Sequence, residues 1–288
     1  MLWLVIIFLI FLGLSIGFSF AVCHRRAQKN YHSPAEFDLA FEEVNLCTRD
    51  GIHLYGWWIP VDGSKRTLIL LHGFCGSCDP DLKYVPAFHA RGYNVLMFDF
   101  RAHGRSGGIY SSIGALEKQD CQAAVNYALS RGSTAIGLMG FSMGGRVALL
   151  SASKLPPQVK AIISDGGPAR LTTAISGEMT SRKIPRWLAA ILAFMVELGM
   201  SLCTGIDLFQ QEPWWQAASL SPLPVLFIHG DLDPCTRVDE LEHMVQTAGI
   251  NAESWRIPEA GHRNADVYRP EEYLQKVTAF FERWVTEE

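Results

Sequence analysis

The stretch that decides the fold is Ile136-Gly137-Leu138-Met139-Gly140-Phe141-Ser142-Met143-Gly144-Gly145. An apolar run of strand length leads into a Gly-x-Ser-x-Gly sequence, and a helix-length segment, 143–154, follows it. A sharp strand-to-helix turn leaves no room for side chains at Gly140 and Gly144, and it lifts the intervening serine clear of the sheet. The turn also sets that serine at a helix N-terminus, where amide groups favour negative charge. Ser142 is therefore the candidate nucleophile.

The segments around this stretch repeat the same alternation of strand and helix. The apolar runs are short, rich in Val, Ile and Leu, and not alternating, which is typical of strands covered on both faces. Helix-length segments separate them, so the sequence predicts an α/β fold with a doubly wound, mostly parallel sheet of about eight strands. The expected strands are 42–48, 52–59, 68–71, 95–98, 136–139, 161–163, 225–228 and 253–257.

One segment, about 168–216, is too long for an ordinary crossover between two strands. It contains a strongly apolar stretch that begins at Trp187 and ends at Met200. We interpret it as a helical cap inserted over the active site. Trp187, Ile191 and Met195 are the residues that we expect to line a substrate pocket there, although core packing or contact with lipid would suit the same side chains.

A serine hydroxyl is a poor nucleophile without a base, so the chain must also supply a histidine and a carboxylate that orients it. His229-Gly230-Asp231-Leu232-Asp233 follows the strand 225–228, and Ala260-Gly261-His262 follows the strand 253–257. Side chains at the carboxyl ends of parallel strands gather at one edge of the sheet. The pattern predicts His262 as the base and a carboxylate of the first segment, Asp231 or Asp233, as its partner.

Five blocks together resemble the α/β-hydrolase superfamily, in its branch of bacterial serine esterases with a short cap, over roughly residues 42–285. The resemblance implies the triad Ser142, Asp233 and His262, with Asp231 as the fallback acid, and an oxyanion hole made by the backbone N–H groups of Phe74 and Met143. Arg101-Ala102 departs slightly from the Arg-Gly that the family usually has. The blocks are Leu71-His72-Gly73-Phe74, Asp99 to Ser106, the Ser142 turn, His229 to Asp233, and Gly261-His262.

The N-terminal run from Leu2 to Val22 carries no charged side chain over 21 residues. A helix of that length measures about 30 Å, enough to cross the hydrocarbon core of a bilayer. His24, Arg25, Arg26 and Lys29 follow it, which predicts a cytoplasmic body by the positive-inside rule. We expect an anchor over 1–22, a linker over 23–38 and a hydrolase domain over 39–288. The alternative is a signal peptide cleaved after Ser19-Phe20-Ala21, with a secreted domain.

Composition narrows the class of protein further. Hydrophobic residues make up 49% and charged residues 19% of the 288 residues, and the net charge is -4, so a large core is expected and no basic footprint for nucleic acid exists. The seven cysteines are odd in number and scattered, which favours free thiols in a reducing compartment. Cys75-Gly76-Ser77-Cys78 is a single C-x-x-C in the oxyanion loop; a structural or incidental role is expected, with a redox or metal-binding pair as the alternative. No metal or cofactor is expected, and the oligomeric state cannot be predicted.

The predicted activity is hydrolysis of carboxylic esters through an acyl-enzyme, with small apolar or lipid-like esters as substrates and the membrane as the other partner. Thioesterase and serine peptidase activities remain alternatives, because the same residues serve thioesters and amides. A non-catalytic, membrane-tethered binding protein on the same fold is the alternative from a different class.

Overall fold

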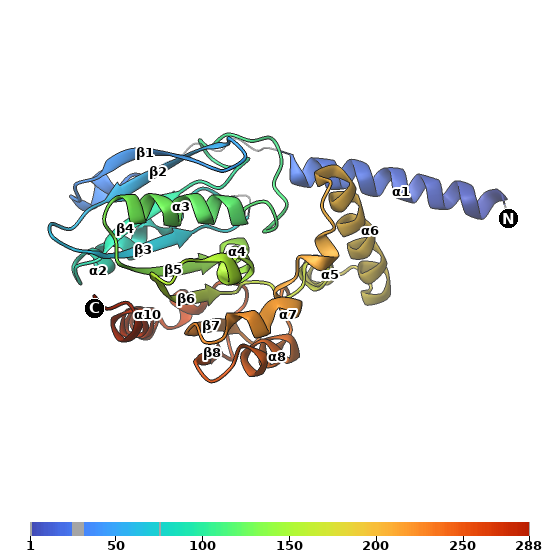
Figure 1. Cartoon of the computed structure of the whole chain (residues 1–288). Helices are drawn as coiled ribbons and strands as arrows, with labels where there is room; N and C mark the ends of the chain where they lie inside the picture. The colour runs from blue at the N-terminus through green and yellow to red at the C-terminus, as the bar shows by residue number, and fades with distance from the viewer. Residues whose placement is uncertain (1, 25–31, 75, 288) are drawn as a thin grey trace.

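The predicted mostly parallel sheet is confirmed: the described part of the chain is built on an eight-stranded sheet in which β2 alone runs against its neighbours (Figure 1). The computed structural model describes residues 2–24, 32–74 and 76–287. The order across the sheet is β1-β2-β4-β3-β5-β6-β7-β8. The strands are β1 (Glu42–Cys47), β2 (His53–Ile59), β3 (Arg66–Leu71), β4 (Asn94–Phe98), β5 (Ala135–Phe141), β6 (Val159–Asp165), β7 (Val225–Gly230) and β8 (Ala252–Ile257).

Helices cover both faces of the sheet, which explains the continuous apolar runs of the central strands. In β3, Ile69 and Leu71 belong to one buried cluster while Leu68 and Leu70 belong to the other, because successive side chains of a strand point to opposite faces. The first cluster is covered by α3 (Lys118–Ser130), α4 (Met143–Ser151) and α8 (Val238–Ala248). The second is covered by α2 (Val85–His89) and α10 (Pro270–Trp284), with α9 (Ala265–Tyr268) at its edge.

The segment between β6 and β7 carries three α-helices; the first two pack on each other beside the sheet, and the third packs on α4 and α8. It contains α5 (Leu171–Ser181), α6 (Arg186–Thr204) and the short α7 (Pro213–Gln216). Figure 1 shows α5 and α6 beyond the end of the sheet at which β5 and β6 terminate. Their position follows from sequence length, since so long an insertion must fold outside the layers that cover the sheet.

The N-terminal helix α1 (Leu2–Cys23) lies beside α6 along its C-terminal part, and its N-terminal end projects away from the rest of the molecule (Figure 1). Ser15 and Ser19 are buried, whereas Trp3 and Leu14 are exposed. The three cations Arg25, Arg26 and Lys29, on which the predicted orientation depends, lie outside the described residues.

By length and composition, one helix in the described part of the chain could cross a membrane, and it is α6. About a third of its most apolar window is buried against the protein. Within α1, Leu12–Cys23 forms a shorter apolar helix. Length and composition alone are weak grounds for a membrane span, because the buried helix of a soluble protein meets the same criteria.

Candidate active site

Ser142 stands at the turn between β5 and α4 with φ 51° and ψ −113°, a strained conformation for a residue with a side chain. Two glycines make the turn possible. A Cβ at Gly144 would lie 1.9 Å from the carbonyl oxygen of Leu71, and a Cβ at Gly140 would lie 2.3 Å from that of Gly144. The Ser142 N–H is satisfied by the carbonyl of Asp165 at 2.8 Å. The backbone therefore holds the hydroxyl in a fixed position above the sheet.

Three side chains from different strand ends, Ser142, His262 and Asp233, form a chain of contacts that starts at this hydroxyl. His262 Nε2 lies 2.8 Å from Ser142 Oγ, and His262 Nδ1 lies 2.8 Å from Asp233 Oδ2. The other Asp233 oxygen accepts the N–H of Cys235 at 2.7 Å. Because the Asp233 carboxylate is fully buried and paired on both oxygens, it fixes the histidine ring with Nδ1 protonated and Nε2 free to accept a proton.

The pKa of His262 results from opposing effects. Burial lowers it, while hydrogen bonding to Asp233 and Cys235 and the negative charge of Asp233 raise it by more, so that the net pKa lies above the ordinary 6.5 of histidine. The imidazolium is the form that Asp233 stabilises. The raised pKa makes His262 a stronger base, which favours transfer of the serine proton to its ring during the reaction.

Two other carboxylates near the site already have different partners. Asp231, the fallback acid, forms a two-point ion pair with Arg256 at 2.8 and 2.9 Å. Asp165, at the end of β6, accepts a hydrogen bond from the hydroxyl of Tyr273 at 2.7 Å. Asp233 is thus the carboxylate that contacts His262.

The two residues expected to supply the oxyanion donors, Phe74 and Met143, line the same cavity as Ser142. Met143 is the first residue of α4, and the first amides of a helix have no acceptor within it. The loop that carries Phe74 runs past the serine, since a Cβ at Gly73 would lie 3.6 Å from Ser142 Cβ. His72 holds this loop: its Nε2 accepts the Phe100 N–H at 2.8 Å, and its Nδ1 donates to the Gly73 carbonyl at 2.7 Å.

His72 is neutral in this arrangement. Burial lowers its pKa to about 3, with the nearby His103 as a second cause. A histidine with one nitrogen donating and the other accepting cannot take up a further proton without losing a hydrogen bond. Its two hydrogen bonds therefore hold the loop after β3 against the loop after β4.

Ser142 opens into a cavity of about 600 Å³ whose walls are mostly apolar. Val196 and Met200 of α6 line it, whereas Trp187, Ile191 and Met195, the residues predicted for the pocket, do not. Trp187 and Ile191 lie on the outer side of the helix, 68% and 51% exposed. The prediction chose the wrong face, because α6 is apolar around most of its circumference and its sequence does not mark the face turned to the serine.

Sequence reasoning missed two residues beside His262. Arg263 directly follows it, is half-buried, donates to Asp81 at 2.9 Å and stacks over the ring of Phe141 at 4.3 Å. Cys235 lies in the same loop as Asp233 and lines the cavity with Ser142. The sequence signalled neither, since their contacts come from segments distant in the chain.

Asp233, Cys235 and His262 also offer three donor atoms within 4.8 Å of one another, a group that could hold a metal ion. A cation bound there would displace the proton that joins Asp233 to His262. The same residues cannot then serve as a proton acceptor for Ser142, so metal binding and base function exclude each other at this site. The predicted role of Cys75 with Cys78 concerns a residue outside the described ones.

Comparisons with known proteins agree with this geometry. A family described as having the α/β hydrolase fold matches residues 66–192, which include the Ser142 turn. The uncharacterized protein YfhR of Escherichia coli O157:H7 is 27% identical over 245 residues, 79% of this chain and 78% of that protein. Protein bem46 of Schizosaccharomyces pombe is 27% identical over 214 residues, 72% of this chain and 65% of that protein.

Among solved structures, the esterase Pf2001 of Pyrococcus furiosus is similar, with a TM-score of 0.78 and 29% identity over 92% of this chain and 99% of that chain. The chain has the α/β-hydrolase fold, and these matches support its place in the α/β-hydrolase superfamily. Family and structural neighbours together support hydrolase activity. Asp233 and His262 lie beyond the segment that the family matches, so their roles rest on the distances given above.

The turn at Ser142 gives a first prediction. Gly144→Ala forces a Cβ against the Leu71 carbonyl, so we expect it to lower the free energy of unfolding by about 1–3 kcal/mol or more. Gly261→Ala is the matched control, because a Cβ there meets its nearest atom at 3.8 Å. Thermal denaturation of both variants measures the difference. Equal melting temperatures for Gly144→Ala and the unchanged protein would contradict the steric account of the turn.

Proposed function

We propose that the protein is a serine esterase in which Ser142 is the nucleophile, His262 the base and Asp233 the residue that orients it. The observation that carries the proposal is the unbroken chain of two 2.8 Å contacts from Ser142 Oγ through the His262 ring to a buried carboxylate. A structural serine would need no such partner, and the strained backbone at Ser142 adds support, since strain of this kind gathers at functional sites.

The reaction follows from the positions of the atoms. Ser142 Oγ attacks the ester carbonyl carbon while His262 Nε2 takes its proton, and Asp233 stabilises the resulting imidazolium. The N–H groups of Met143 and Phe74 bind the oxyanion. The imidazolium then gives its proton to the leaving alcohol, and the acyl-enzyme forms. Water, deprotonated by the same histidine, releases the acid and restores the serine.

The proposed substrate is an ester with an apolar acyl group. Support comes from the cavity around Ser142, which is lined mainly by aliphatic and aromatic side chains, such as Phe74, Ile175 and Met200. Such a cavity favours a hydrocarbon chain through burial of its surface. A peptide would bring backbone N–H and C=O groups into the same space and leave them without partners.

Labelling of the serine tests the catalytic proposal. A fluorophosphonate should label the purified protein, and Ser142→Ala should lose both the label and at least about 10⁴ of the rate of p-nitrophenyl ester hydrolysis. Ser151→Ala, on the same helix but away from the site, is the control and should be labelled normally. Faster turnover of acyl thioesters or peptide anilides than of esters would select those activities instead. An unlabelled protein without activity would be a binding protein.

The pH dependence tests the roles of His262 and Asp233. Because activity needs neutral His262 and its pKa is raised, kcat/KM should climb with pH along a limb whose midpoint lies above about 6.5. Asp233→Asn removes the charge that raises this pKa, so the midpoint should move down while the rate falls by about 10⁴. Profiles for both proteins on one soluble ester give the comparison. A midpoint at or below that of free histidine in the unchanged protein would rule out the Asp233–His262 pairing.

We also propose that α1 tethers the protein to a membrane, with the domain on the cytoplasmic side. The 13 residues of α1 that precede Ser15 would span only about 20 Å, less than a hydrocarbon core of about 30 Å. Full insertion of α1 would therefore bring the α6 face beside it into contact with lipid. Exposed Trp187, Ile191 and Phe194 on α6 support that arrangement.

Cell fractionation tests the tether. The full chain should stay with the membrane pellet through an alkaline carbonate wash, and protease added to sealed inside-out vesicles should digest the domain. The physical reason is that an apolar helix 22 residues long binds the bilayer far more tightly than surface charge alone. A soluble protein with a new N-terminus near Val22, found by N-terminal sequencing, would show cleavage of a signal peptide instead.

A further inference from the structure

Helix α1 forms specific hydrogen bonds with the domain, which a simple membrane anchor would not need. Ser15 Oγ donates to the Met195 carbonyl at 2.5 Å and Ser19 Oγ donates to the Val196 carbonyl at 2.8 Å. Both serines are buried, at 7% and 0% exposure. They stand four residues apart, so they share one face of α1. That face is turned to α6.

The opposing surface of α6 is shaped for close approach. A Cβ at Gly199 would lie 2.5 Å from Ser19 Oγ and 3.2 Å from the Ser15 carbonyl. Small residues that let two helix backbones approach, together with hydroxyls that bond across them, are the features of specific helix pairing in apolar surroundings. Ser19 and Gly199 thus form a matched contact between the first helix and the cap.

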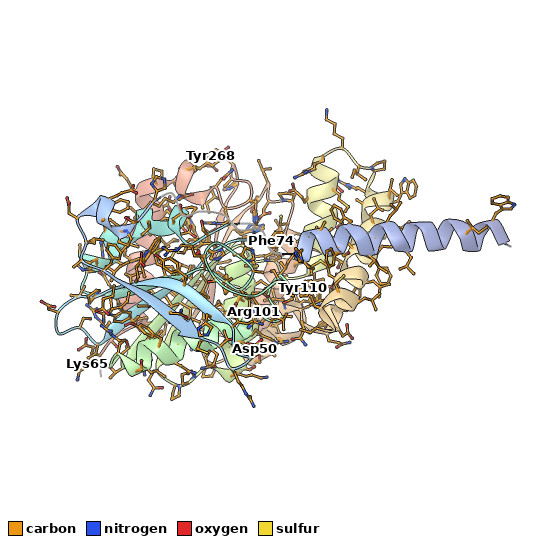
Figure 2. All side chains as sticks on the ribbon, turned by 90° about the horizontal axis from the view of Figure 1, so that it is seen from above. Asp50, Lys65, Phe74, Arg101, Tyr110 and Tyr268 are labelled. Carbon is orange, nitrogen blue, oxygen red and sulfur yellow. The ribbon has the colours of Figure 1, made fainter. Side chains whose placement is uncertain are left out.

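The C-terminal end of α1 is also joined to the domain by backbone contacts. The Cys23 carbonyl accepts the Ser111 N–H at 2.8 Å, and His24 forms an antiparallel bridge with Tyr110. Figure 2 shows the labelled Tyr110 and Phe74 beside this end of the helix. Cys23 itself is 1% exposed. The helix is therefore held at two places, along α6 and at the loop next to the active site.

Near these attachments, α1 contributes two apolar side chains to the cavity at Ser142. Phe18 and Val22, four residues apart, line the same cavity as Ser142, Met143 and Phe74. Val22 is half-buried and Phe18 is 53% exposed, so Val22 lies deeper and Phe18 lies at the rim. The family match begins at residue 66, and both residues are thus outside the part of the chain that resembles the family most clearly.

We propose that α1 forms one wall of the acyl-binding cavity and that Phe18 and Val22 set the length of acyl chain that the enzyme accepts. This inference rests on the esterase proposal, because it assigns a role in substrate binding to the cavity around Ser142. The ligand class is a hydrocarbon acyl chain, which would pack between Val22 on α1 and Met200 on α6 with its ester carbonyl at Ser142.

Substitutions on α1 in the detergent-solubilised full chain test the proposal through the ratio of kcat/KM for p-nitrophenyl octanoate to that for the butyrate. Val22→Phe fills the inner part of the cavity and should lower this ratio by about tenfold or more. Ala21→Phe is the matched control: it places the same ring on the exposed neighbouring position and should leave the ratio within about twofold.

Phe18→Ala provides a second variant with little risk of misfolding, since it removes atoms from a half-exposed side chain. It deletes apolar contact at the rim and should also lower the ratio, by about tenfold. Leu14→Ala, at an exposed position one turn before Phe18 and outside the cavity, is its control.

Fluorophosphonate labelling separates this inference from the esterase proposal. If labelling and butyrate turnover persist while the ratio falls only in Val22→Phe and Phe18→Ala, the wall assignment stands. If labelling persists and both variants keep the ratio of the unchanged protein, α1 has no part in acyl selection. If the unchanged protein itself is not labelled, the esterase proposal fails, and this inference fails with it.

Discussion

The backbone at Ser142 is the constraint on which the rest of the site depends. Its φ of 51° belongs to a turn so tight that the backbone at Gly140 and Gly144 has no room for a Cβ. Gly144, for example, packs directly against the Leu71 carbonyl. Strand β3 is thereby fixed at van der Waals distance from the start of α4. The hydroxyl then has one position relative to the sheet edge, and the loops after β7 and β8 must reach that position to supply a base and an acid.

The choice among nearby acids is settled by which of them already has a partner. Asp231 is paired with Arg256, and Asp165 is bonded to Tyr273, which leaves Asp233 facing the imidazole. This arrangement has an electrostatic consequence. Arg263, adjacent to His262, would oppose protonation of the ring, yet Asp81 takes up its charge at 2.9 Å. Asp81 thus offsets the charge of Arg263, and Asp233 can still favour the protonated form of His262.

Sequence predicts the local part of this design well. Short Val-, Ile- and Leu-rich runs predicted the sheet because burial on both faces demands such residues, and the glycine spacing predicted the turn because steric contact demands it. The lining of the cavity could not be predicted in the same way. In α6, apolar residues surround the helix, so the sequence gives no clue that Val196 and Met200 turn inward. Likewise, the sequence does not indicate that the hydroxyls of Ser15 and Ser19 bond to carbonyl groups of α6.

The docking of α1 joins two properties that the sequence suggested were separate, attachment to a membrane and the shape of the cavity. A hydroxyl in an apolar environment is costly without a partner, and Ser15 and Ser19 have theirs on α6. Moving α1 into lipid without α6 would break both bonds, expose Gly199 and remove Phe18 and Val22 from the cavity. The docked state satisfies the same hydroxyls in water and in lipid alike. On these proposals, the helix stays docked on the cap when the protein is at the membrane, and the same segment serves as anchor and as part of the active site.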